Sequence, residues 1–491
     1  MSTEGPLIAA IDLGTSACRA AVFDPMGKAL AEHYEEYESI TLPDGAVEQD
    51  AGLWWEVAAR CLGSVLSEVD AGAVAALGIS AQGHSWVPVG ENRRPLRNAF
   101  CWLDTRADAE VREALRRVPA EHWGHVAGKL PATWHLLPQA LWSRKHEPGL
   151  IDGAAKWLMC GDYLIARLTG VFVTDPTAAA TTLLLDIRER AWADDFLRAF
   201  RIPWEKLPRV RPAGLAVGTA EPDVAEAIAL PPRCSVVLGS QDQKLAAFAA
   251  GLRPGIATVS LGTATAISTL SDRPSYDRAL GVPCFPFLEA RQWVFEAPIG
   301  ATGAALRWAR GAIGPAGAGY EGLTALATES PPGANGVQFF PFLSGATSPH
   351  WNGQARGAFH GISLSTSRAD LIRAVMEGVA FEIATNLLAL EQLSSDIEEV
   401  VLFGGGARSR VWREIIAAAC RRPVRVLSVT EAACLGAAML AAPAARIFDS
   451  PEEAQTGMAP GAEIVAADAP LADAYASVFA AYELDRARLL S

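Results

Sequence analysis

Short apolar runs that end in polar clusters recur through the first half of the chain. The runs occupy residues 73–80, 99–103 and 235–239. They lead into Gln82-Gly83-His84, Asp104-Thr105-Arg106 and Ser240-Gln241-Asp242-Gln243, respectively. Helical patterns accompany them at 50–69 and 105–117. Strands alternating with helices predict an α/β sheet, and polar clusters at strand ends mark the carboxyl edge, where such sheets bind ligands.

The alternation begins again after Gly251. Helical patterns occupy 304–310, 367–390, 411–420 and the alanine-rich stretch 432–445, which is too short to span a bilayer and contains a proline. A chain of 491 residues exceeds what one core usually supports. The turn signal Leu252-Arg253-Pro254-Gly255 separates the two alternations. We therefore predict two α/β domains, residues 1–251 and 252–491.

One local pattern is found in both predicted domains. LIAAIDLGTSACRAAVFD at 7–24 and GIATVSLGTATAISTL at 255–270 each contain an apolar strand, then L-G-T with small residues, then a second β-rich run. This order predicts a β-hairpin whose turn offers backbone N–H groups and a hydroxyl group to a phosphate, because glycine lets the anion approach the backbone. Two such turns predict one nucleotide held between two domains, although two ordinary hairpins are the alternative.

The two predicted hairpins differ in charge. Asp12 precedes the first turn, whereas Ser260 has the equivalent position before the second. A single carboxylate beside one of two phosphate turns is what a shared Mg²⁺ ion needs. Thr15, Ser16 and Thr263 add hydroxyl donors. No G-x-x-x-x-G-K-[ST] motif is present, so a P-loop is excluded.

Composition and charge narrow the class of protein. Half of the residues are hydrophobic and a fifth are charged, as in ordinary globular proteins. The net charge of −13, without a dense Lys/Arg run, disfavours nucleic acid and anionic membranes as partners. Eight scattered cysteines without a C-x-x-C pair predict buried thiols in a reducing cytoplasm. The N-terminal apolar stretch lacks the basic start of a signal peptide, so we expect a cytoplasmic protein.

Asp242 is the candidate catalytic residue. It follows an apolar strand and opens a helical stretch, so its carboxylate can accept a proton from a hydroxyl group that attacks a phosphoryl group. An Asp that only caps the helix is the alternative. His84, in a turn expected to be exposed, and Asp104 can bind a polyhydroxyl substrate; a histidine satisfied within the fold and an Asp104–Arg106 pair are the alternatives. Trp86, Trp102 and Trp134 can line a sugar pocket, but core packing is the default for each of the fourteen tryptophans.

A triple glycine, Gly404-Gly405-Gly406, lies between an apolar strand and a helix, which suits close approach of an adenosine. With the other motifs it makes the sequence resemble the FGGY family of carbohydrate kinases, from about Leu7 to about Leu440. The resemblance is carried by IDLGTSACRAAVFD, VEQDAGLWWE, LGISAQGHS, WLDTR, LGSQDQKLAAFAAG, VSLGTAT, PFLSGATSPHWNGQARGAFHGIS, RAVMEGVAFE and LFGGGARSRVWREIIA. It implies two actin-like ATPase domains of ribonuclease H-like α/β fold, with a nucleotide and sugar cleft between them, and use of ATP and Mg²⁺.

The resemblance also assigns roles to individual residues. It implies that Asp242 is the catalytic base and Asp12 the metal contact. Phosphate and nucleotide contacts are implied at Gly14, Thr15, Ser16, Arg19, Thr263, Gly303, Arg307, Gly406 and Arg410. Sugar contacts are implied at Gln82, Gly83, His84, Trp102, Asp104 and Gln243.

The substrate is less well defined by the resemblance. Xylulokinases usually carry Q-M-H-G and W-N-D-x-R where this chain has Gln82-Gly83-His84-Ser85 and Trp102-Leu103-Asp104-Thr105-Arg106. Gln243 is as in glycerol kinases, but their Arg-Glu pair is replaced by Gly83-His84, which disfavours glycerol. We expect Gly83 to enlarge the site, and His84 and Asp104 to bind the additional hydroxyl groups of a five-carbon chain.

We therefore predict ATP-dependent phosphorylation of a terminal hydroxyl group of a ketopentose, D-xylulose-like, by direct in-line transfer. Erythritol, L-xylulose, ribulose, a glycerol-like polyol or a sugar acid are alternative substrates. A non-enzymatic ATP-driven interaction protein of the actin-like superfamily is the rival outside enzymology. The expected partners are a sugar or polyol and ATP, without nucleic acid or membrane, and a homodimer stays open as the assembly.

Overall fold

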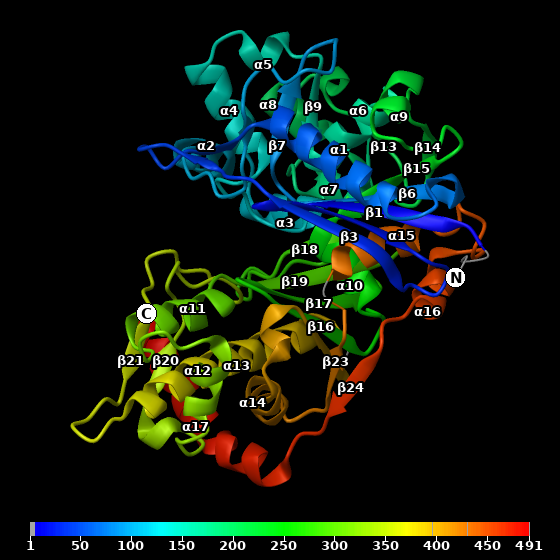
Figure 1. The fold of residues 1–491 in the computed structure, drawn as a ribbon. Helices are drawn as coiled ribbons and strands as arrows, with labels where there is room; N and C mark the ends of the chain where they lie inside the picture. The colour runs from blue at the N-terminus through cyan, green and yellow to red at the C-terminus, as the bar shows by residue number, and fades with distance from the viewer. Residues whose placement is uncertain (1–4, 395, 430, 491) are drawn as a thin grey trace.

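The computed structural model of the chain describes residues 5–394, 396–429 and 431–490. These residues form two lobes, which lie one above the other in Figure 1. The upper lobe is built from the first half of the chain and the lower lobe from the second half. Each lobe contains a mixed β-sheet with helices packed on it, which is the expected α/β class.

The main sheet of the upper lobe has the strand order β14-β15-β6-β1-β2-β3. Its strands are β1 (Leu7–Leu13), β2 (Ala17–Phe23), β3 (Ala29–Glu36), β6 (Val74–Ala81), β14 (Ala216–Thr219) and β15 (Ser235–Gln241). β1 pairs antiparallel with β2 and parallel with β6, and all seven of its residues are buried. A strand that is apolar at every position except Asp12 fits this central position, because helices cover both faces of the sheet.

Helices α1 (Ala51–Ser67) and α6 (Cys160–Thr169) cover one face of this sheet. An insertion extends the lobe around a second sheet and its own apolar core. That sheet contains β4 (Ile40–Thr41), β5 (Val47–Gln49), β8 (Ala99–Phe100), β7 (Trp86–Val89) and β9 (Lys156–Met159). The other elements of this half are α2 (Asp108–Arg117), α3 (Ala120–Ala127), α4 (Leu136–His146), α5 (Leu150–Gly153), α7 (Pro176–Ala180), α8 (Asp194–Phe200), α9 (Pro222–Ala227), and the pairs β10 (Val173–Thr174) with β13 (Arg209–Val210) and β11 (Leu185–Asp186) with β12 (Ala191–Trp192).

The main sheet of the lower lobe has the strand order β18-β19-β17-β16-β22-β23-β24. Its strands are β16 (Ile256–Leu261), β17 (Thr265–Ser271), β18 (Cys284–Pro286), β19 (Trp293–Ile299), β22 (Glu399–Phe403), β23 (Val424–Leu427) and β24 (Ala462–Val465). The long helix α13 (Arg368–Leu393) packs against β17 and β19 and is almost entirely buried. The remaining elements are α11 (Gly303–Ala312), α12 (Tyr320–Ala327), α14 (Arg410–Cys420), α16 (Pro451–Gly457), α17 (Ala469–Leu490) and the pair β20 (Gln338–Phe340) with β21 (Ala358–His360).

Two helices lie between the lobes and pack against each other (Figure 1). They are α10 (Asp242–Ala249), which ends the first half, and α15 (Ala432–Ala441), which comes from the second half. α15 packs against β1 and β6 of the upper lobe, while α10 contacts β16 of the lower lobe. The largest apolar core therefore runs through both lobes.

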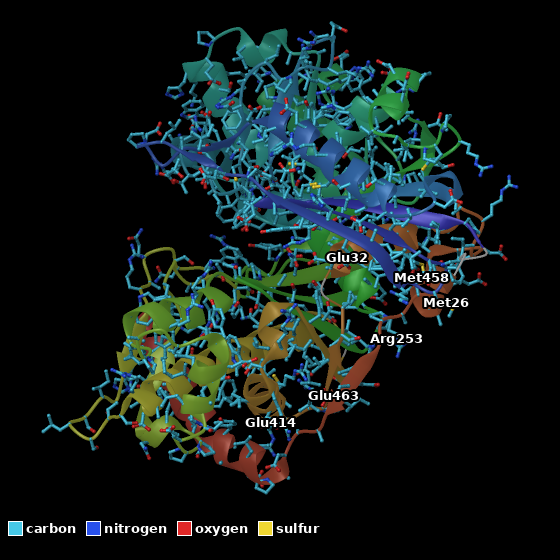
Figure 2. The ribbon with its side chains drawn as sticks, viewed as in Figure 1. Met26, Glu32, Arg253, Glu414, Met458 and Glu463 are labelled. Carbon is cyan, nitrogen blue, oxygen red and sulfur yellow. The ribbon has the colours of Figure 1, made fainter. Side chains whose placement is uncertain are left out.

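A second contact between the halves lies at one edge of the molecule. In Figure 2, Met26, on the turn between β2 and β3, lies beside Met458, which follows α16. Gly27 in that turn has φ of +78° and packs against the backbone of Met458. The division into two domains at residues 251/252 stays our proposal. The second half of the chain supplies α15, which packs on the sheet of the first lobe.

Most predicted elements occur, with shifted ends. The helix predicted at 50–69 is α1, whose N-cap is Asp50, and the strand predicted at 235–239 continues to Gln241. The apolar run 99–103 forms a strand only at Ala99–Phe100, because the chain turns at Cys101, whose carbonyl accepts from Asp104 N. Among the described residues, no helix has both the length and the apolar character needed to cross a membrane.

Candidate active site

The first predicted hairpin is formed by β1 and β2, with Gly14, Thr15 and Ser16 in the turn. Gly14 N donates to Ala17 O at 2.9 Å. Side chains hold the turn from below: Gln49 Nε2 donates to Thr15 O at 2.7 Å, and Tyr37 donates its hydroxyl proton to Gly14 O. Within the described chain, the N–H groups of Thr15 and Ser16 meet no acceptor. They are therefore available to an anion such as a phosphate.

The second predicted hairpin is formed by β16 and β17, with Gly262, Thr263 and Ala264 in the turn. The start of α11 holds this turn through its backbone: Gly303 N donates to Gly262 O at 2.9 Å, and Ala304 N to Thr263 O at 3.0 Å. A Cβ atom on Gly303 would lie 2.4 Å from Gly262 O, so this contact requires glycine. Arg307, one turn into α11, donates to Thr263 Oγ1 at 3.3 Å. The structure therefore brings together Thr263, Gly303 and Arg307.

Asp12, which precedes the first turn, and Asp242 are carboxylates that lie close enough to affect each other's charge. Asp12, near the end of β1, accepts a hydrogen bond of 2.7 Å from Ser80 Oγ of β6. Burial raises the pKa of Asp12, while Ser80 and the charge of Arg19 lower it. Asp242 is the first residue of α10, and its Oδ1 accepts from Gln243 N at 2.7 Å. Burial, and then the charge of Asp12, raise the pKa of Asp242 to about 8.

The alternative role of Asp242 as a helix cap does not fit this geometry. Gln241 occupies the N-cap position of α10, and its side chain makes no capping hydrogen bond. Asp242 lies one residue further along and is half-buried. A carboxyl group with a pKa near neutrality takes up and releases a proton under working conditions, which is what a general base must do.

The expected sugar residues Gln82, Gly83 and His84 follow the end of β6. Gln82 is buried; its Nε2 donates to Gln49 Oε1 at 2.9 Å, and its Oε1 accepts from Ser85 Oγ at 3.2 Å. A Cβ on Gly83 would lie 2.7 Å from Gln241 Nε2, so the Gln241 side chain fills the space beside Gly83. The expectation that Gly83 enlarges the site is therefore wrong.

His84 does not lie in an exposed turn, as the sequence suggested. It has φ of +65°, and its imidazole packs edge-on against His135 with 5.1 Å between ring centroids. Burial, and then the charges of Lys129 and Lys244, lower the pKa of His84 to about 3, so the ring is neutral. Its Nδ1 is buried and, among the described residues, has no hydrogen-bond partner. An orphaned ring nitrogen beside Asp242's strand end can bind a substrate hydroxyl group.

Trp102 and Asp104 have different environments. Trp102 is 37% exposed, and its Nε1 donates to Thr15 Oγ1 at 2.8 Å, so it links the expected sugar side to the first hairpin. Asp104 is fully buried; its Oδ2 accepts from Arg106 Nε at 2.7 Å and from Val47 N at 3.2 Å. The structure thus shows the internal Asp104–Arg106 pair, in which both oxygens of the Asp104 carboxylate accept from partners inside the fold. Trp86 is fully buried and donates to Gln139, so it belongs to the core.

The remaining expected contacts are spread more widely. Gln243 is half-buried next to Asp242, and in the described part of the chain its side chain has no hydrogen-bond partner. Gly406 lies in a single turn of 3₁₀-helix (Gly405–Arg408) that packs on Leu261, beside the second hairpin. Arg410 is 89% exposed in its side chain and pairs with Glu414 along α14, away from the carboxylates. Arg19 bonds to Glu431, the N-cap residue of α15, at 2.8 Å.

Four residues near the carboxylates or the second hairpin escaped the sequence analysis. They are Ser80, which bonds to Asp12; Thr302, which bonds to Gly262 O at 3.1 Å; and Lys244 and Glu296, which pair at 2.6 Å. Ser80 lies at a strand end, which is a signal that could have identified it. Lys244 and Glu296 are 52 residues apart in sequence, and only the fold brings them together.

Comparison with known proteins gives a consistent result. Two family models match: the N-terminal domain of the FGGY family of carbohydrate kinases over residues 7–249 and its C-terminal domain over 257–445. The chain is 29% identical to a xylulose kinase of Escherichia coli strain K12 (95% of each chain). It is 26% identical to a gluconokinase of Bacillus subtilis strain 168 (90% of this chain, 88% of that protein). The crystal structure of a xylulose kinase from Lactobacillus acidophilus superposes with a TM-score of 0.93 and 25% identity, covering 99% of each chain.

Proposed function

Because the chain belongs to the FGGY family of carbohydrate kinases, we propose that it transfers the γ-phosphoryl group of ATP to a terminal hydroxyl group of a ketopentose such as D-xylulose. Asp242 is the proposed general base. The observation that carries the proposal is the placement of Asp242 directly after β15, close enough to Asp12 beside the first hairpin for the Asp12 charge, with burial, to raise the pKa of Asp242 to about 8.

The chemistry follows from these groups. Asp242 takes the proton from the substrate hydroxyl group as its oxygen attacks the γ-phosphorus of ATP. The bond between the γ-phosphorus and the bridging oxygen breaks, and ADP leaves. The N–H groups of Thr15 and Ser16 on one lobe, and of Thr263 and Ala264 on the other, hold phosphate oxygens. Trp102 keeps the first turn in place through Thr15.

The donor set beside the first hairpin fits Mg²⁺. Asp12 offers a buried carboxylate of which one oxygen accepts from Ser80, and it lies near enough to Asp242 for its charge to raise the pKa of Asp242. Hard carboxylate oxygens next to a phosphate turn are the ligands this ion prefers. When bound, the ion neutralises charge on the phosphoryl oxygens. Asp12 would hold it.

Two candidate substrate classes have separate support. A ketopentose is supported by the xylulose kinases among the relatives and by the free Nδ1 of His84. A sugar acid is the second candidate, because gluconokinases also occur among the relatives.

A sugar-dependent ADP-release assay over pentuloses, hexuloses, tetritols, glycerol and aldonates tests the proposal. We expect D-xylulose or a close ketopentose to have the largest kcat/KM and glycerol a far smaller one, since a site built to bond hydroxyl groups discriminates by up to about 10⁴-fold when they are missing. His84→Ala should lower kcat/KM for the best sugar. It should change KM for ATP to a smaller extent. ATP hydrolysis that no sugar or sugar acid stimulates would favour an ATP-driven interaction protein instead.

Asp242→Asn tests the general base directly. Loss of a general base costs roughly 10²–10⁴-fold in kcat, while ADP affinity, measured by calorimetry, should stay within a few-fold of the unaltered protein. Near-normal turnover would remove Asp242 from the mechanism. We also propose a cytoplasmic location, and homodimer assembly stays a prediction for sedimentation velocity to measure.

A further inference from the structure

Two lysines contact one phenylalanine ring where the lobes meet. Lys129 Nζ lies 3.9 Å from the centroid of Phe285, and Lys244 Nζ lies 4.0 Å from it. The lysines belong to the upper half and Phe285 belongs to β18 of the lower lobe. Lys244 has in addition an anionic partner, Glu296 Oε2 on β19, at 2.6 Å, whereas the Lys129 ammonium donates to the carbonyl of Ala127 at 3.0 Å.

Lys244 is close to the reacting group in sequence and in space. It is the third residue of α10, two positions after Asp242, and its side chain is completely buried. A buried ammonium ion is stable only when paired and bonded, so Glu296 and the face of Phe285 fix where this turn of α10 lies. The pair therefore fastens the first turn of the catalytic helix to the sheet of the other lobe.

Glu296 connects onward to the second phosphate hairpin. It pairs with Ser268 of β17 across the sheet, and β19 ends three residues later at Ile299. The chain then reaches Thr302 and Gly303, which bond to Gly262. A continuous path thus runs from Asp242 through the Lys244–Glu296 pair and β19 to the turn that holds a phosphate.

We propose that Lys244 and Glu296 are positioning residues: their ion pair across the lobes holds the Asp242 carboxylate in register with the second phosphate hairpin. The proposal rests on the proposed function of Asp242. It adds to that function a link through which the arrangement of the lobes controls the base.

The charges that face Asp242 predict the direction in which its pKa should change in each variant. Asp12 on β1 and Glu296 on β19 raise the pKa of Asp242, and Lys244 on its own helix lowers it. The thiol of Cys160 on α6 is also within electrostatic reach, and burial keeps it protonated by raising its pKa well above the usual value. Removing the charge of Glu296 should therefore lower the pKa of Asp242, and removing the charge of Lys244 should raise it.

The test is the pH dependence of kcat/KM for Glu296→Gln and Lys244→Met, with the best sugar at saturating ATP. Asp242 must be ionised to act as a base, so activity falls as the pH drops through its pKa. We expect the acidic limb to move down by about half a pH unit in Glu296→Gln and up by a similar amount in Lys244→Met. We expect kcat to fall roughly tenfold in both, with a smaller change in KM for sugar.

The double variant Lys244→Met/Glu296→Gln covers the case in which an unpaired buried charge prevents folding. It leaves no lone charge, so we expect it to fold by circular dichroism, with an acidic limb near the original position and a reduced kcat. Lys129→Met is the matched control: it touches the same ring without the ion pair, and its acidic limb should not move. We do not expect Lys129 to restore the kcat of Lys244→Met, although it contacts the same ring.

The outcomes separate the two proposals. If Asp242→Asn removes activity while Glu296→Gln and Lys244→Met keep the acidic limb and kcat of the unaltered protein, the positioning role is wrong and the base stands. If the acidic limbs of Glu296→Gln and Lys244→Met move in the same direction, the pair affects only packing, and the proposal is also overturned. If Asp242→Asn keeps its activity and acidic limb, the proposed function itself fails.

Discussion

The two hairpins share the letters L-G-T and the same backbone turn, but they are supported in different ways. The first is held by side chains: Tyr37 and Gln49 bond to its carbonyl groups, and Trp102 bonds to Thr15. The second is held by the backbone at the start of α11, with Arg307 on Thr263. Only the first has a carboxylate beside it, since Asp12 is replaced by Ser260 in the second.

This difference separates two tasks that one motif could have performed twice. Gln49, which supports the first turn, also accepts from the proposed sugar residue Gln82, and the strand before this turn carries Asp12, the proposed metal ligand. The second turn is held mainly through backbone atoms, with the Thr302 hydroxyl group on Gly262 O and Arg307 on Thr263, and its close contact with α11 requires the absence of a side chain at Gly303. A repeated backbone motif therefore acquires its role from what packs beneath it.

The largest expected effect comes from removing the carboxylate that distinguishes the hairpins. Asp12→Ala should lower kcat by roughly 10²–10³-fold, because charge on the transferring group loses its stabilisation, and should raise the Mg²⁺ concentration needed for half-maximal rate. Ser260→Ala, at the equivalent position, should change either quantity less than twofold, within the ~0.5 kcal/mol of an ordinary substitution. Mg²⁺ titrations at fixed ATP measure both, and equal responses would mean that the hairpins have the same role.

A smaller effect should follow from disturbing the backbone support of the second turn. Gly303→Ala places a Cβ 2.4 Å from Gly262 O, and the required shift costs about 1–3 kcal/mol. We expect KM for ATP to rise roughly tenfold, since a tenfold change corresponds to about 1.4 kcal/mol, which lies within this cost. We also expect a lower melting temperature. Gly311→Ala, on the same helix, meets open space and should instead stabilise by about 0.5–1 kcal/mol. If the two variants have the same KM for ATP and the same melting temperature, the close contact at Gly303 does not contribute to ATP binding.

The smallest effect should come from the side-chain support of the first turn. Trp102→Phe keeps an aromatic ring but loses the 2.8 Å bond to Thr15, worth about 0.5–1.5 kcal/mol. We expect kcat/KM to fall two- to tenfold for the best sugar. Trp308→Phe is the matched change in the lower lobe, since within the described residues the Trp308 indole stacks on Phe339 without donating a hydrogen bond. An identical loss in both would show that the hydrogen bond is not responsible.

The sequence was informative where the chemistry is local. Each hairpin follows from an apolar strand, a glycine and a hydroxyl residue within a few positions, and Asp242 was identifiable from its strand end. The surroundings of Gly83 and Asp104 were not. Gly83 depends on a side chain far along the chain, and the sequence left open whether Asp104 binds a substrate or pairs with Arg106, two residues later. Gln241 lies across Gly83, and Arg106 pairs with Asp104 inside the fold. The Lys244–Glu296 pair lacked any local pattern, since an isolated lysine and glutamate are ordinary in any sequence.

The packing of α15 against the upper lobe has a consequence for biosynthesis. A Cβ atom on Gly78 of β6 would lie only 2.2 Å from the carbonyl oxygen of Ala437 in α15. The helix backbone therefore packs directly on the strand. The ribosome completes residue 251 before it makes this helix, about 190 residues later, which takes roughly 10–40 seconds at ordinary elongation rates. During that interval α10 can cover β6 and β15, but β1 lacks the cover that α15 supplies. We expect the nascent upper lobe to bind a chaperone until α15 emerges, and a ribosome-bound chain arrested before residue 432 should be more sensitive to protease than one arrested after the full chain has emerged.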